Sequence, residues 1–456
     1  MASDKRPLII PAEEQSRELN AKLLLASVAA ARGFPCFVGE RREIHLHLNH
    51  LPRGIYYAKS FRTLSLRIFR ILNDLGHEIV ACDEEALLTM PDEVYYERRL
   101  CPEAMGMITH LFAWGPENER LFAEYPHYTG TPIHVTGNPR IDLMRSELRG
   151  CLDPEAEVYR ERYGDFILIN TNFGTINHRV ASLSWLSFLE IPEDESLTHE
   201  EEYKIAATRH RLDLFTHFKE VLPVLARRFP HMQIVLRPHP LEAHAPWREA
   251  TQGCENVHVV HEGNVLPWML AAKAIVQNNC TTAIEGYILD RPIVSYLPVQ
   301  SERFDVLLTN AMGHPAYDAD HLCSLLAEII DGKRGIPTGG EPRRMLERYI
   351  SGLNGRLASD RIVDALEAAE HDGGCPPTTT WLRESLASLH VRARTLEKII
   401  RAQIPGDKNS RVYQDQRFPG LRIEEVRERI RGFGRALGRL EKRRVEEVAR
   451  NIYRID

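Results

Sequence analysis

A guanidinium and an imidazole follow an apolar segment near the middle of the chain. The run Ile234–Leu236 ends at Arg237, Pro238, His239 and Pro240. Arginine presents paired donors that match phosphate oxygens, and histidine can add a hydrogen bond or a positive charge. The two prolines would stiffen the turn and fix the direction of both side chains. The pattern favours a site that stabilises a departing phosphate, and the alternative is a rigid strand-to-loop turn.

A second polar segment follows the apolar run Ala274–Val276. Its hydrogen-bonding side chains are Asn278, Asn279, Thr281, Thr282 and Glu285. A helix is expected to begin within it, and the free N–H groups at a helix start attract anions. Glu285 could accept hydrogen bonds from ribose hydroxyls. Alternatively, Thr281 or Thr282 is an ordinary N-cap with Glu285 as its capping-box partner.

A third candidate segment follows the apolar run Phe166–Ile169. It contains Asn170, Asn172 and Gly174, a combination that often lies close to a phosphate. The spacing lacks G-x-G-x-x-G, so it is no dinucleotide fingerprint. A plain turn is the alternative.

Acidic residues supply candidates for a general base. Asp83, Glu84 and Glu85 follow the apolar run 78–82, and adjacent acids raise one another's proton affinity, which helps a base. The alternative is a helix N-terminus stabilised by acids. Glu13, with Glu14 beside it, is a rival base or an acceptor-binding residue.

The segment Gly137–Asp142 closes the first half of the predicted fold. Its Asn138 and Arg140 could bind the acceptor, or they could belong to a structural turn. The sequence shows no cluster of metal-ligand residues. We therefore expect neither a metal nor a cofactor.

The order of apolar runs predicts an α/β protein with two doubly wound sheets. We place an acceptor-side domain at residues 1–155 and a nucleotide-sugar domain at 156–371, facing each other across a cleft. Residues 372–380 are expected to be a linker, followed by an amphipathic helical tail to residue 456. The tail would hold two helices joined by a polar loop at 405–419, and the apolar stripe of the second continues through Val448, Ile452 and Ile455.

Charge is distributed unevenly along the 456 residues. The net charge is −6, yet residues 376–456 carry 19 Lys or Arg against 11 Asp or Glu. A basic amphipathic tail favours contact with an anionic membrane surface or self-association. Because the rest of the chain is acidic, nucleic-acid binding is not expected. With no apolar leader and no membrane-length apolar run, we expect a cytoplasmic protein.

Three motifs carry a resemblance to a known family. They are VTGNPRIDLM, IVLRPHP and NNCTTAIEGYILDRPIVSY, supported by CDEEAL. With them, residues 8–330 resemble the bacterial surface-carbohydrate biosynthesis proteins, which have a GT-B glycosyltransferase fold. The His-Pro pair is also similar to the motif of capsule Kdo transferases and bacterial sialyltransferases, which use CMP-activated ulosonic acids.

The resemblance implies that His239 holds the CMP phosphate and that Asp83 or a neighbour is the base. The sialyltransferase acidic motif ends in Gly, whereas Ala86 follows here. The expected activity is transfer of a sugar, such as Kdo, from a CMP-sugar to a glycan or lipid-linked acceptor in capsule or lipopolysaccharide synthesis. The alternatives are a CDP-alditol phosphotransferase or a nucleotide-sugar epimerase of the same fold, and a non-enzymatic binding or scaffold subunit with a vestigial cleft.

Overall fold

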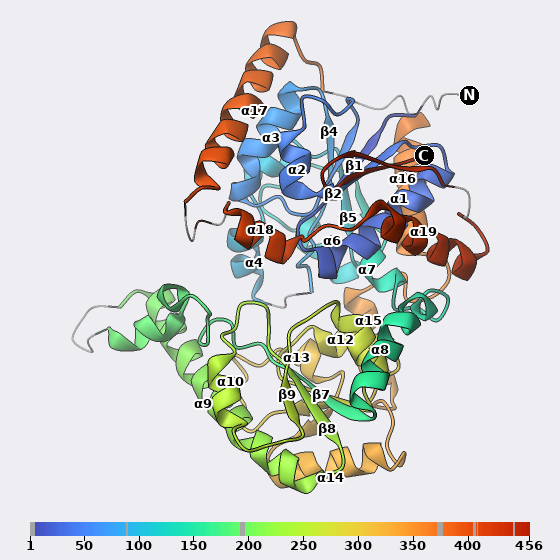
Figure 1. Ribbon diagram of the computed structural model, residues 1–456. Helices are drawn as coiled ribbons and strands as arrows, with labels where there is room; N and C mark the ends of the chain where they lie inside the picture. The colour runs from blue at the N-terminus through green and yellow to red at the C-terminus, as the bar shows by residue number, and fades with distance from the viewer. Residues whose placement is uncertain are drawn as a thin grey trace. The chain divides into compact units, whose positions relative to one another are not determined.

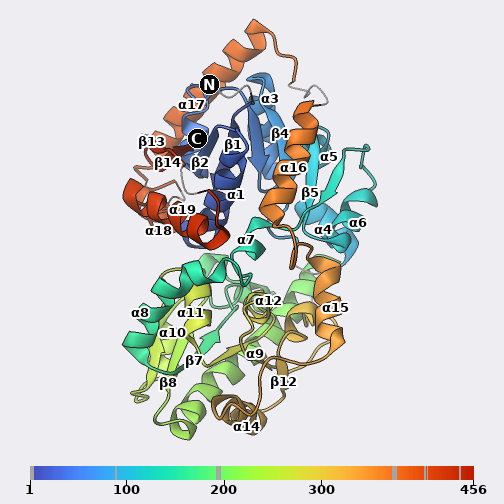
Figure 2. The same ribbon diagram turned by 90° about the vertical axis from the view of Figure 1, so that its right-hand side faces the viewer.

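The computed structural model of the chain folds into two compact units (Figures 1 and 2). Unit 1 combines Met1–Cys151 with Glu347–Asp456, and unit 2 is the continuous segment Leu152–Leu346. The structure describes residues 5–87, 90–191, 197–371, 377–404, 407, 409–440 and 443–456.

Unit 1 is built on an eight-stranded sheet in the order β13-β14-β2-β1-β3-β4-β5-β6. Its parallel strands are β1 (Leu8–Ala12), β2 (Cys36–Glu40), β3 (Ile55–Ala58), β4 (Glu78–Cys82), β5 (His110–Ala113) and β6 (Ile133–Val135). The chain leaves β1 for β2 on one side and later places β3 on the other. The space above β1 and β3 is therefore the switch point at which open α/β sheets bind ligands.

Helices cover both faces of this sheet, because alternate side chains of each strand point to opposite faces. Leu8 and Ile10 belong to the core under α1 (Asn20–Ala31), α16 (Ala358–His371) and α19 (Ile423–Leu437). Ile9 belongs to the opposite core, which includes α2 (Arg41–Leu46), α3 (Leu66–Asp74) and α17 (Trp381–Arg401). The sheet is doubly wound.

Unit 2 has a six-stranded parallel sheet in the order β12-β11-β10-β7-β8-β9. The strands are β7 (Phe166–Asn170), β8 (Gln233–Arg237), β9 (Val257–Val259), β10 (Ala274–Gln277), β11 (Ile293–Tyr296) and β12 (His314–Ala316). One face packs on α9 (His199–Arg228) and α14 (Ala319–Ile330). On another side, α8 (Asp153–Tyr163) packs on α11 (Val265–Ala271), where Tyr159 stacks on Trp268 at 3.7 Å. The prediction of two doubly wound α/β sheets is confirmed.

The end of the chain differs from the expected helical tail. α17 and α19 form as predicted, but the chain then turns into β13 (Val445–Ala449) and β14 (Ile452–Ile455). β14 pairs antiparallel with β2, and β13 pairs with β14. Ile452 and Ile455 therefore do not extend a helical stripe; they are buried in the sheet of unit 1. The boundary expected at residue 371 is also wrong, because Glu347–His371 belongs to unit 1.

The predicted linker 372–380 lies partly outside the described residues. Within the predicted loop 405–419, α18 (Arg411–Arg417) forms a short helix. Among the helices of the described residues, none combines the length and apolar character needed to cross a membrane.

Candidate functional site

The switch point of unit 2 lies between β7 and β10, since the strand order reverses there. Asn172 follows β7 and Asn279 follows β10. The Asn172 Nδ2 donates to the Asn279 carbonyl oxygen at 3.2 Å. The loops containing Asn170, Asn172, Asn278 and Asn279 therefore meet at the carboxyl edge of this sheet, which is the edge where open α/β sheets usually bind ligands.

Asn170 and Arg237 are partners in the β7–β8 register, so their side chains share one face of the sheet. Both are buried, with exposed fractions of 3% and 9%. The terminal Nη2 of Arg237 donates to the carbonyl oxygens of Glu262 at 3.1 Å and Gly263 at 2.7 Å. Burial lowers the pKa of Arg237 to about 10, against opposing effects of Tyr159 and other groups, so it keeps its charge at neutral pH.

Two donors of this pair have no acceptor among the described residues. They are the Nδ2 of Asn170 and the Nε of Arg237. A buried donor without a partner costs about 1–3 kcal/mol, so native proteins rarely keep one without a function or a bound molecule. An acceptor-rich ligand such as a phosphate would satisfy both.

His239 lies two residues beyond β8, half-buried, in the turn between Pro238 and Pro240. Its Nδ1 accepts a hydrogen bond from the Leu241 N–H at 3.3 Å. This bond directs the proton of a neutral imidazole to Nε2. The loop after β7 comes close, since a Cβ added to Gly174 would lie 3.5 Å from this Nδ1 and 3.1 Å from the Leu241 Cβ.

Glu242 was not singled out from the sequence, yet its carboxylate joins the two loops. Its Oε1 accepts from the Thr171 hydroxyl at 2.8 Å, the Phe173 N–H at 3.0 Å and the His239 N–H at 3.1 Å. Its Oε2 accepts from the Trp247 Nε1 at 2.9 Å. Burial raises the pKa of Glu242 above its usual value, although these four donors act in the opposite direction. The signal in the sequence was an acidic residue three positions after His239, in the turn that follows β8, and it was not recognised.

Asn278 and Asn279, two further residues of the predicted phosphate site, make structural contacts. Asn278 is buried, and its Nδ2 donates to the Tyr296 carbonyl at 2.8 Å. The Asn279 Oδ1 accepts from the Val306 N–H at 2.7 Å and the Asn310 Nδ2 at 2.8 Å. These two side chains therefore shape the loop. Asn279 has a φ of +49°, a conformation that asparagine tolerates better than most residues.

The helix after β10 begins at Thr282, as α12 (Thr282–Ile288). Thr281 is its N-cap but makes no side-chain capping bond, so the ordinary capping interpretation is not supported. The Thr282 hydroxyl donates to the Cys280 sulfur at 3.1 Å. Glu285 is buried, and its charge favours the protonated Arg237.

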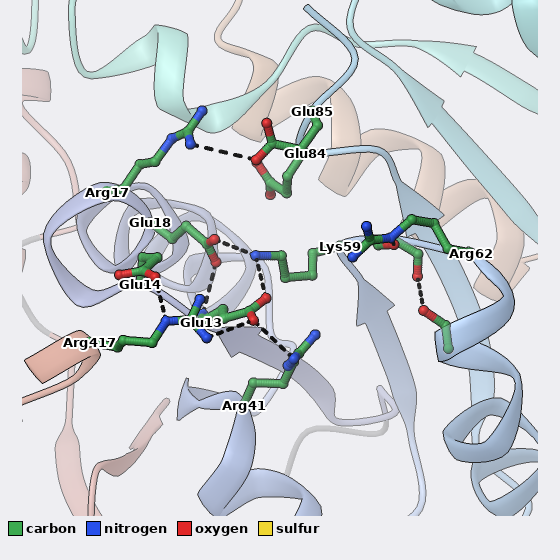
Figure 3. A network of polar contacts seen from close by, with 12 residues as sticks. Glu13, Glu14, Arg17, Glu18, Arg41, Lys59, Arg62, Glu84, Glu85 and Arg417 are labelled. Atoms are coloured by element: carbon green, nitrogen blue, oxygen red, sulfur yellow. Dashed lines mark hydrogen bonds and ion pairs between the residues drawn. The ribbon is translucent and has the colours of Figure 1, made fainter. Parts of the chain in front are cut away.

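Charged side chains crowd the switch point of unit 1 (Figure 3). Glu13 follows β1 and Lys59 follows β3, and their side chains pair at 3.0 Å. Arg41, the first residue of α2, and Arg417, from α18, each contact Glu13 at 3.0 Å. Burial raises the pKa of Glu13, but the three cations outweigh it and lower that pKa to about 2. Glu13 is therefore ionised and held by cations, which makes it a poor proton acceptor.

Asp83 is enclosed by structural contacts. Its carboxylate accepts hydrogen bonds from the Arg99 Nε at 3.0 Å and from the Arg99 Nη2. It also accepts one from the Tyr95 hydroxyl at 2.9 Å. It is 1% exposed. A carboxylate saturated in this way cannot reach an acceptor hydroxyl, which argues against the expected role of Asp83 as the base.

Glu84 and Glu85 have different environments. Glu84 is buried, pairs with the Lys22 ammonium and accepts from the Asn138 Nδ2 at 3.3 Å. Burial raises its pKa, but Lys22 and Arg140 lower it to about 2, contrary to the expectation that clustered acids favour protonation. The Glu85 side chain is 33% exposed and lies 3.5 Å from Arg17. Glu85 remains the candidate base among the three.

Asn138 and Arg140 lie inside unit 1 rather than on an open surface. Asn138 is the N-cap of α7 (Pro139–Asp142), and its Oδ1 accepts from the Arg140 N–H at 2.9 Å. The Arg140 guanidinium lies over the Trp114 ring at 5.7 Å. Both are buried. These contacts favour the structural-turn interpretation over acceptor binding.

Among the described residues, no group of three or more His, Cys, Asp or Glu side chains is arranged to hold a metal ion. No protein-family model matches the chain. No curated protein matches it either.

Solved structures with a similar fold include two UDP-GlcNAc 2-epimerases and a polymerase. The Methanocaldococcus jannaschii epimerase, in complex with UDP-GlcNAc and UDP, has a TM-score of 0.49 and 12% identity, covering 79% of this chain and 99% of its own. The wall teichoic acid polymerase TagF, as a histidine variant with CDPG, has a TM-score of 0.49 and 12% identity, and the match covers 81% of this chain and 90% of TagF. A putative epimerase from Listeria monocytogenes has a TM-score of 0.48 and 12% identity, and the match covers 82% of this chain and 99% of the epimerase.

Proposed function

We propose that the chain is an enzyme of carbohydrate metabolism that binds a nucleotide-activated sugar at the carboxyl edge of the unit 2 sheet. The transferred group would leave a nucleotide phosphate beside Asn170, Arg237 and His239. Arg237 and the Nε2 of His239 would stabilise the negative charge that develops there. No metal is required for this role of the side chains.

One observation carries the proposal: the unused donors of Asn170 and Arg237 lie on one face at the end of β7 and β8. They lie at the carboxyl edge, where ligands of such sheets bind. The surrounding contacts fix the geometry, since Glu242 holds the His239 turn against the β7 loop. Such preorganised donors lose little entropy when they receive a phosphate.

The sequence resemblance refines the proposal to a glycosyltransferase of surface-polysaccharide synthesis. The favoured donor is a CMP-sugar of an ulosonic acid such as Kdo, and the acceptor is a glycan or a lipid-linked glycan. Glu85 would take the acceptor proton, because it is the only one of residues 83–85 that is not buried.

The first test is binding. A thermal-shift screen with CMP, CDP, UMP, UDP and GDP should raise the melting temperature with one cytidine nucleotide more than with the others, since a ligand of the folded state stabilises it. His239→Ala should reduce this shift and lower turnover by at least about 100-fold. His231→Ala is the matched control, because His231 is exposed and precedes β8. Near-normal turnover of His239→Ala would contradict the role of that residue.

Product analysis separates the alternatives. A glycosyltransferase releases CMP and forms a glycosidic bond. A CDP-alditol phosphotransferase releases CMP and forms a phosphodiester, and an epimerase converts its sugar nucleotide without an acceptor. Absence of binding to every nucleotide tested would oppose all three.

For α17 we propose contact with an anionic membrane surface. Its large apolar side chains Trp381, Leu382, Leu386, Leu389, Leu396, Ile399 and Ile400 are each more than half exposed. The same helix carries five Lys or Arg and two Glu. Two equally basic helices would repel each other, so its charge favours an anionic bilayer over a second copy of the chain.

A further inference from the structure

Four arginines line a cavity at the end of the chain, within unit 1. The cavity has a volume of about 280 Å³ and lies between α19 and β13. Arg427 and Arg431 come from α19, and Arg443 and Arg444 precede and adjoin β13. Nothing in the proposed function uses these residues.

The positive charge of the cavity is only partly neutralised. Arg444 pairs with Glu446, the one acidic side chain among the described residues of the lining, and Arg431 lies 3.6 Å from Glu428. Arg427 and Arg443 make no ion pair with any described residue. The cavity therefore presents an excess of cationic groups to whatever enters it.

Backbone contacts hold the two uncompensated guanidinium groups in place. Arg427 donates to the Val445 carbonyl at 2.9 Å, and Arg443 donates to the Ala30 carbonyl at 3.0 Å. The Nε of Arg443 is buried and has no acceptor among the described residues. A fixed guanidinium with a buried unused donor is arranged to receive an oxyanion.

The apolar part of the lining adds to this effect. Ile430 and Val445 are 2% and 3% exposed and lie beside the charged groups. Apolar neighbours weaken the screening of charge by water, so an ion pair formed here is stronger than one on an open surface. A volume of about 280 Å³ is just below the range of sites for drug-sized ligands, which suits a phosphate on a small group.

The cavity is separate from the charged switch point of the same sheet. Val445 pairs with Ile455, and Ile455 pairs with Cys36, the first residue of β2. The cavity thus lies at the amino edge of the parallel strands, whereas Glu13 and Lys59 follow the carboxyl ends of β1 and β3.

We infer that this cavity, the four-arginine cavity, binds the phosphate of a small phosphomonoester. The dianion would contact Arg427 and the Nε side of Arg443, with Arg431 and Arg444 at the rim. Bound there, it would connect α19 to β13. The shared chemistry is a phosphomonoester dianion, which a soluble sugar phosphate or a phosphatidate headgroup could provide.

The test titrates the full chain with glucose 1-phosphate by calorimetry, at fixed ionic strength, with glucose as the uncharged control. We expect one site, and we expect the Arg427→Gln, Arg443→Gln double variant to bind at least tenfold more weakly. Arg435→Gln is the matched control, because Arg435 is on α19 but does not line the cavity. The His239→Ala variant should bind glucose 1-phosphate like the wild type, which separates this site from the donor site.

Unchanged affinity in the double variant, or no binding by the wild type, would overturn the inference. So would loss of binding in His239→Ala alone. If the double variant does not fold, Arg431→Gln with Arg444→Gln replaces it, since both side chains are exposed and are expected to give at least threefold weaker binding. A second arm measures binding to vesicles that contain phosphatidate. If the wild type binds these vesicles and glucose 1-phosphate, and the Arg427→Gln, Arg443→Gln double variant loses both, the shared chemistry is supported. Vesicle binding without glucose 1-phosphate binding contradicts the small ligand.

Discussion

Asn170 and Arg237 lie directly opposite each other in the β7–β8 ladder, and each keeps one buried donor without an acceptor. The two residues are 67 positions apart in the sequence. Their juxtaposition follows from the parallel register alone. The folded protein thus carries a local energetic cost that a bound phosphate would remove.

This relationship predicts opposite behaviour for two buried asparagines. Asn170→Ala should change the free energy of unfolding by less than about 1 kcal/mol, because an unused donor is removed. It should also reduce the melting-temperature shift caused by the preferred nucleotide. Asn278→Ala removes the bond to the Tyr296 carbonyl and should cost about 1–2 kcal/mol. Thermal melts with and without nucleotide measure both, and an equal loss of stability in the two variants would contradict the interpretation.

Glu242→Gln tests the carboxylate that joins the two loops. The Oε1 contacts can persist, but an amide nitrogen placed beside the Trp247 Nε1 would set one donor against another. We expect a loss of about 1–3 kcal/mol of unfolding free energy and a shift in tryptophan fluorescence. Nucleotide affinity should fall much less than stability, since the Oε1 contact that positions His239 persists. Glu249→Gln, on the same segment, serves as control and should change neither.

Glu84 predicts a specific acid dependence of stability. Its pKa is about 2 in the folded protein and 4.5 in an unperturbed side chain, so its contribution is present above pH 4.5 and is lost as the pH falls towards 2. We expect the free energy of unfolding to fall as the pH drops below 4.5. Urea denaturation at neutral pH and near pH 3 would measure it.

The matching variant is Glu84→Gln. It leaves the buried Lys22 ammonium without its partner and should cost about 3–5 kcal/mol at neutral pH. Its acid dependence should be flatter than that of the wild type. Glu85→Gln, at a partly exposed position, should behave like the wild type, and an identical acid profile of Glu84→Gln would refute the assignment.

The exposed face of α17 can be tested without disturbing the fold. Leu389→Gln with Leu396→Gln alters side chains that are 61% and 59% exposed, so the melting temperature should change by no more than a few degrees. Flotation with anionic vesicles should decrease at least threefold relative to the wild type. Neutral vesicles provide the comparison, and undiminished flotation of the variant would dismiss α17 as the contact.

Much of the fold follows from local sequence patterns. The apolar runs at residues 166–170 and 233–237 alternate with helical segments, and these patterns are sufficient to predict parallel strands. The polar residues that end each strand could be placed at the carboxyl edge for the same reason. Glu242 could not be weighted correctly, because its importance lies in partners from two loops that only the folded chain brings together.

The C-terminal strands illustrate a different limit. Val445–Ala449 and Ile452–Ile455 are short and follow a long amphipathic helix, so their apolar residues also fit a continued helical stripe. The partner that makes them strands is β2, more than 400 residues earlier. Likewise, the pairing of Arg417 with Glu13 leaves no local sequence signal.

The position of β14 has a consequence for how the polypeptide acquires its shape during synthesis. Residues 36–40 emerge early from the ribosome, but the strand that pairs with one of their edges, Ile452–Ile455, emerges more than 400 residues later. Unit 2 is continuous and complete well before that point. We therefore expect unit 2 to fold first. Until β14 emerges, the N-terminal part of unit 1 has an unpaired edge at β2, which favours association with chaperones.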